Sequence, residues 1–105
     1  MNKTMHNKLV RDLIPEIIER DGKQGIYRKI NGSELNKALV DKLSEEGEEL
    51  LQEVNLEELA DLLEIVHALI GLNNFEFEDV ETIRKLKQEQ RGAFSQGIFL
   101  EYVIE

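Results

Sequence analysis

The segment Leu39–Leu72, LVDKLSEEGEELLQEVNLEELADLLEIVHALIGL, decides the fold of this 105-residue chain. Apolar residues recur in it at intervals of three and four, the spacing of one helix face. The pattern predicts a helix over Ser33–Glu53, with Ser33 as its N-cap, and a second helix over Leu56–Leu72. Asn55 is placed to cap the second helix in a capping box with Glu58. We therefore expect a helical hairpin at the centre of the chain.

Two pairs of acidic residues stand on these helices, Glu46 with Glu49 and Glu58 with Asp61, each pair three residues apart. That spacing puts both members on one helix face. Glu46 also continues a stripe of leucines, so its carboxylate faces the expected core, where an unpaired charge is costly. Four converging carboxylates repel one another unless a cation joins them. An all-oxygen donor set favours Mg²⁺, with Mn²⁺ as a substitute.

An ordinary structural interpretation of the same acids stays open. Glutamate is a good helix former and commonly lies on a solvated face, so the acidic pairs also fit a wet acidic edge. Glu58 has a further structural role available, as the third residue of the capping box.

Charge is distributed unevenly along the chain, whose net charge is −9. No Lys or Arg occurs from Leu43 to Ile83, and all 13 basic residues lie outside that stretch. An acidic chain of this kind is a poor ligand for a nucleic acid polymer. A phosphate-bearing small molecule remains compatible if the basic flanks fold over the acidic centre. The chain has no cysteine, no long apolar run and no signal-peptide core, so we expect no membrane contact and a cytoplasmic location.

The flanks predict two or three more elements. A turn or short helix is expected over Leu9–Leu13, a helix over Pro15–Arg20 closed by Asp21-Gly22, and another helix from Glu78 or Asp79 to Gln90. The segment Ala93–Glu105 is expected to be extended, with a possible hairpin turn at Gln96-Gly97. The fold class is therefore all-α: one domain over residues 1–105, a helical bundle of four to five helices with a short extended C-terminal segment, completed by dimerisation.

Three blocks of the sequence together resemble a known family. The order E-E-x-x-E-L at 45–50 and E-E-L-A-D-L-L-E at 57–64 resembles the MazG-type all-α nucleoside triphosphate pyrophosphohydrolases. The block H-N-K-L-V-R-D-L-I-P-E-I-I at 6–18 is similar to the N-terminal segment of the phosphoribosyl-ATP pyrophosphohydrolase-like branch. The block K-x-x-x-R-G-A-F at 87–94, followed by G-I-F-L at 97–100, is similar to that branch's C-terminal segment. One departure is the interval of only eight residues between Glu49 and Glu58.

The resemblance implies an enzyme with metal ligands at Glu46, Glu49, Glu58 and Asp61. It also implies a homodimer or a dimer of dimers, and hydrolysis of the α–β phosphoanhydride of a nucleotide. A carboxylate not committed to the metal is needed as general base, and the candidates are Glu45 and Glu49.

Phosphate contacts are expected from cations of the flanks, because the acidic centre has none of its own. The candidates are Lys8, Arg11, Lys87 and Arg91, each of which also fits ordinary surface charge. Phe94 either lies against a nucleobase or packs on the helices. The expected function is clearance of nucleoside triphosphates by Mg²⁺-dependent release of pyrophosphate. Phosphoribosyl-ATP hydrolysis and a non-catalytic helical interaction protein are the alternatives.

Overall fold

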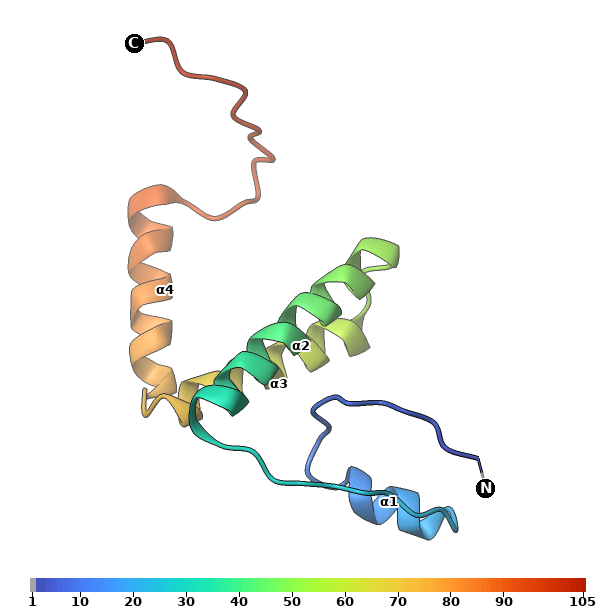
Figure 1. Cartoon of the computed structure of the whole chain (residues 1–105). Helices are drawn as coiled ribbons and strands as arrows, with labels where there is room; N and C mark the ends of the chain where they lie inside the picture. The colour runs from blue at the N-terminus through green and yellow to red at the C-terminus, as the bar shows by residue number, and fades with distance from the viewer. Residues whose placement is uncertain (1) are drawn as a thin grey trace.

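The computed structural model describes residues 2–105 and contains four helices (Figure 1). They are α1 (Ile14–Arg20), α2 (Gly32–Gln52), α3 (Leu56–Leu72) and α4 (Phe77–Arg91). No strand occurs among the described residues, so the all-α expectation is confirmed. The proposed turn or short helix over Leu9–Leu13 is a turn that leads directly into α1.

The start of α3 is the one that the sequence predicts. The side chain of Asn55 accepts a hydrogen bond from the backbone N–H of Glu58, with 2.9 Å between Asn55 Oδ1 and the nitrogen. The expected N-cap of α2 at Ser33 is wrong. Asn31 is the last residue with extended backbone, and Ser33 already lies inside the helix. No side chain caps α2, which shows why a hydroxyl near a helix start does not by itself locate the N-cap.

Left-handed residues end α1 and α3. Gly22, at φ +75°, follows α1, and its N–H donates to the carbonyl of Glu19, as the Asp21-Gly22 signal predicts. After α3, Asn74 adopts φ +58°, and the N–H of Phe75 donates to the carbonyl of Ile70 at 3.0 Å. This is the Schellman arrangement, which reverses the chain while satisfying the last carbonyls of a helix. It fixes the corner from which α4 departs.

The packed part of the molecule is the hairpin of α2 and α3, which lie side by side (Figure 1). Its core consists of Leu39 on α2 with Ile65 and Ile70 on α3. In Figure 1, α1 and α4 both lie away from this hairpin, and α4 continues into the C-terminal segment. That segment turns at Phe94–Gly97, close to the expected Gln96-Gly97, but it forms no paired strands of a hairpin.

Within residues 2–105, every helix is either too short or too polar to cross a lipid bilayer.

Candidate metal centre

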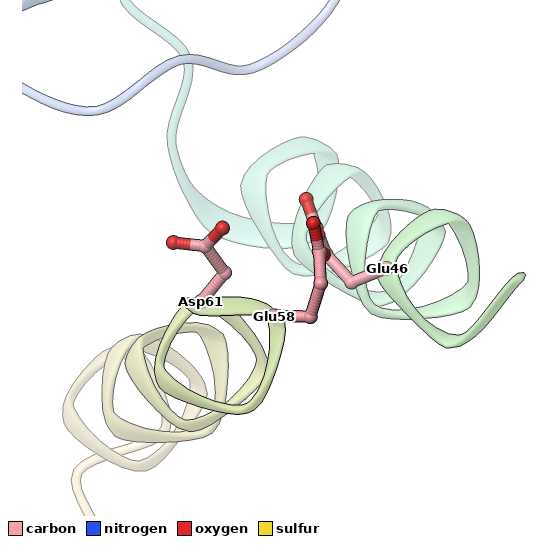
Figure 2. Close-up of side chains that lie close together, drawn as sticks. All are labelled: Glu46, Glu58 and Asp61. Carbon is pink, nitrogen blue, oxygen red and sulfur yellow. The ribbon is translucent and has the colours of Figure 1, made fainter. Parts of the chain in front are cut away.

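Three acidic side chains converge at one end of the α2–α3 hairpin. Glu46 comes from α2, while Glu58 and Asp61 come from the first two turns of α3. One carboxylate oxygen of each lies within 4.8 Å of those of the other two. Figure 2 shows all three carboxylates on the same side of the two helices, with those of Glu46 and Glu58 adjacent. Three of the four acids named by the sequence are thus brought together.

The burial of these groups is unusual for carboxylates. Glu46 is only 8% exposed, and it is the one charged residue buried within the described part of the chain. Its Oε2 atom and Oε2 of Glu58 are both out of contact with solvent, and neither has a hydrogen-bond partner within residues 2–105. Buried carboxylate oxygens without partners are costly unless a cation coordinates them. These two oxygens, together with the partly exposed carboxylate of Asp61, form a set of oxygen donors on two helices that fits a hard divalent cation.

Hydrogen bonding to neighbouring glutamates raises the pKa of Glu58 to about 7. The largest cause of this raised pKa is the hydrogen bond that the protonated carboxyl group of Glu58 makes with Glu49, and the second is the one with Glu46. Desolvation and the negative charges of both neighbours raise the pKa further. Glu49 therefore lies next to the cluster, although it is exposed and stands outside the group of three. A carboxyl group that holds its proton near neutral pH because neighbouring carboxylates share it is typical of a functional site.

Arg11 reaches this cluster from the N-terminal segment. Its Nη2 atom donates a hydrogen bond to Oδ1 of Asp61, with 2.7 Å between them. The pairing joins residues 50 positions apart, and local periodicity gives no signal for it. A cation proposed to contact phosphate is thus placed at the edge of the acidic site, where it neutralises one of the three carboxylates.

Lys8 and Glu45 meet in a separate small hollow of about 180 Å³ between the N-terminal segment and α2. Lys42 also lines this hollow and was missed by the sequence analysis. Lys42 is half-buried and lies four residues before Glu46, so both side chains are on one face of α2. That spacing is the signal that could have identified it. Glu45 belongs to this hollow and not to the group of three carboxylates.

The other expected substrate contacts are not brought to the acidic cluster within one chain. Lys87 and Arg91 lie on α4 and are exposed, and Phe94 is 98% exposed. The acids occupy the beginning of α3, whereas α4 leaves from its far end and runs away from the hairpin (Figure 1). Phe94 therefore does not pack on the helices of its own chain.

Comparison with protein-family models, with curated proteins and with solved structures yields no match for this chain. The site is therefore interpreted from its own geometry and chemistry.

Proposed function

We propose that the chain is a Mg²⁺-dependent nucleotide pyrophosphohydrolase of the MazG type. Glu46, Glu58 and Asp61 would hold the metal, and Glu49 would lie beside it. The observation that carries the proposal is the pair of buried, unpartnered oxygens on Glu46 and Glu58. A solvated acidic edge would leave such atoms in water. The order of the sequence blocks at the two helices and at both flanks supports the same family.

The reaction would be hydrolysis of the α–β phosphoanhydride of a nucleoside triphosphate. A water oxygen forms a bond to the α phosphorus, the bond from that phosphorus to the bridging oxygen breaks, and nucleoside monophosphate and pyrophosphate result. Glu46, Glu58 and Asp61 would hold the Mg²⁺, which would supply positive charge for the phosphates and activate the attacking water. Glu49 is the favoured acceptor of the water's proton, because it adjoins the cluster and stays accessible. Glu45 is the second candidate and would act from the side of Lys8.

Arg11 would contact a phosphate of the substrate, and the position of its guanidinium against Asp61 supports this role. Such a contact would require Arg11 to exchange part of its pairing with Asp61 for a phosphate oxygen. Lys8 and Lys42 supply further positive charge in the neighbouring hollow. We also propose that the protein is cytoplasmic and removes nucleoside triphosphates from the cellular nucleotide pool.

Release of pyrophosphate from purified protein tests the proposal. The protein is incubated with each common NTP and dNTP, and with phosphoribosyl-ATP, in the presence of Mg²⁺ or of EDTA. We expect Mg²⁺-dependent release that Glu46→Gln and Asp61→Asn each reduce at least a hundredfold. Glu48→Gln is the matched control, because it removes the same charge from an exposed position on the same helix.

Preference for phosphoribosyl-ATP over the nucleoside triphosphates would assign the alternative substrate. The proposed enzymatic activity would be refuted if no substrate gave pyrophosphate, or if the Glu46 and Asp61 variants released pyrophosphate as fast as the unmodified protein. One observation favours a non-catalytic interaction protein instead, namely the large apolar surface that α4 and the C-terminal segment expose. That alternative predicts that Mg²⁺ leaves the melting temperature unchanged.

A further inference from the structure

The single chain exposes far more surface than a folded monomer of its size. Its accessible surface is 10067 Å², whereas a compact monomer of the same mass exposes about 6,100 Å². Its radius of gyration is 18.5 Å, against about 13 Å for a compact domain of this length. Each chain therefore exposes roughly 4,000 Å² more accessible surface than a compact monomer of the same mass, by the same scaling.

One arm of the molecule, residues 77–105, exposes eleven large apolar side chains. The first part of the arm, α4, carries an apolar stripe that no other helix covers. The second part is richer still: Phe94 is 98% exposed, Phe99 88% and Ile104 86%. The corner at Asn74 and the stacking of the rings of His67 and Phe77, with centroids 4.8 Å apart, direct the arm away from its own hairpin.

The hairpin in turn offers an apolar groove. A broad hollow of about 690 Å³ lies between α2 and α3 at the end where α4 departs. Its floor is formed by Val40, Val66, Leu69 and Phe75. Its polar rim is ordered by the side chains of Asn36 and Asn73, which exchange two hydrogen bonds of 3.0 and 3.2 Å. The groove is thus preformed by rigid helices and is lined by the kind of side chain that the arm exposes.

We propose that two copies of the chain exchange arms, so that residues 77–105 of one copy cover the α2–α3 groove of the other. A twofold arrangement buries both arms and both grooves at once. Obligate homodimers bury about 2,000–5,000 Å² or more in total, and the excess surface of two chains meets that requirement. A small ligand or a short peptide in the groove would leave the arm exposed.

Charge also favours contact of an arm with a hairpin over contact between two hairpins. Residues 43–72 carry nine carboxylates and no Lys or Arg, so two hairpins repel each other. The distal half of α4 has the opposite sign, with Arg84, Lys85, Lys87 and Arg91 against the single carboxylate of Glu89. The net charge of the distal half of α4 is therefore opposite to that of the hairpin, while the apolar side chains of the arm suit the groove, whose own lining has no carboxylate.

The proposal is tested with engineered thiols, because the chain has no cysteine of its own. Val40→Cys marks the groove and Phe99→Cys marks the arm. The two single variants are unfolded together, refolded and treated with a short bifunctional thiol reagent, without Mg²⁺ or nucleotide. We expect a covalent pair that contains one chain of each variant. Ile26→Cys, 89% exposed on the connector before α2, replaces Phe99→Cys in the control and should give no such pair.

Light scattering of the unmodified chain should give the mass of a dimer, and Phe99→Glu should shift it toward monomer. A folded monomer at every concentration would overturn the proposal. So would association without a link between positions 40 and 99. A link formed within one chain of the double variant Val40→Cys with Phe99→Cys would show that the arm folds onto its own hairpin, and would overturn it equally. None of these measurements depends on catalysis, so they leave the proposed enzyme activity to its own test.

Discussion

Arg11 donates a hydrogen bond to Asp61 across 50 residues of sequence, with 2.7 Å between Nη2 and Oδ1. The pair is the one ion pair, among the described residues, that joins the N-terminal segment to the α2–α3 hairpin. Both side chains remain partly exposed, 55% for Arg11 and 44% for Asp61. The contact therefore orders the flank over the acidic site at modest energetic gain.

Substituting Arg11→Gln should lower the free energy of unfolding in EDTA by about 0.2–1 kcal/mol, as for an exposed ion pair. It should also enlarge the rise in melting temperature on adding Mg²⁺, because the metal no longer competes with a guanidinium for Asp61. Thermal unfolding with and without Mg²⁺ measures both effects. Arg20→Gln is the control, since Arg20 meets its acid, Glu16, only at 3.9 Å. An unchanged or smaller Mg²⁺ effect in the Arg11 variant would contradict this account.

The raised pKa of Glu58 predicts how stability depends on pH. The folded chain keeps the proton of Glu58 up to about pH 7, whereas an ordinary glutamate loses it near 4.5. Between these values the folded state binds more protons than the unfolded state, so the free energy of unfolding of the metal-free protein falls as pH rises. Urea unfolding in EDTA from pH 4.5 to 8 measures this slope, and Glu58→Gln should flatten it. If the free energy of unfolding still falls with pH in that variant, the pH dependence belongs to another group.

The affinity for Mg²⁺ should change with pH in the opposite direction. A carboxylate must lose its proton to bind a metal, so binding should tighten as pH rises through 7 and release a proton. Calorimetric titration with Mg²⁺ in buffers of different ionisation enthalpy counts the protons released. We expect a release that disappears in Glu58→Gln. Equal affinity at pH 6 and pH 8 would remove Glu58 from the set of ligands.

Replacing Glu46 by leucine should make the metal-free protein more stable. The variant removes a buried carboxylate whose Oε2 atom has no hydrogen-bond partner among the described residues, an arrangement that costs about 1–3 kcal/mol, and it adds apolar contact between α2 and α3. It should also abolish the stabilisation by Mg²⁺. Glu48→Leu, at an exposed site two residues away, is the matched control and should show no gain. Loss of stability in Glu46→Leu under EDTA would mean that Glu46 has a partner in solution.

The N-cap of α3 has its own measurable effect. Asn55→Ala deletes the oxygen that accepts from the N–H of Glu58, and it should lower the free energy of unfolding by about 1 kcal/mol. Asn55→Ser retains an acceptor and should recover most of the loss. Urea unfolding of the three proteins provides the comparison. Equal stability of the alanine and serine variants would show that the cap contributes nothing.

Local signals in the sequence located the helices well. Asn55 and the apolar repeat predicted the bounds of α3, and Gly22 marked the end of α1, because capping and left-handed turns depend on residues close in sequence. The convergence of Glu46 with Glu58 and Asp61 was also predictable, since a short connection forces two helices to pack side by side.

Features that depend on distant segments could not be predicted in this way. The pairing of Arg11 with Asp61 requires the N-terminal segment to fold over the hairpin, and no periodicity encodes that path. The hollow that joins Lys8 to Lys42 arises from the same folding of the segment. The position of Lys87 and Arg91 follows from the corner after α3, where the backbone angle of one residue, Asn74, sets the direction of α4.

The core residues Leu39, Ile65 and Ile70 stand on the same two helices as the converging acids. The stability of the chain and its candidate metal site therefore depend on the same α2–α3 hairpin. Under the proposed function, an apolar residue at position 46 would make the metal-free chain more stable and would remove the candidate metal site. Glu46 would then be a residue that lowers the stability of the chain in exchange for a site.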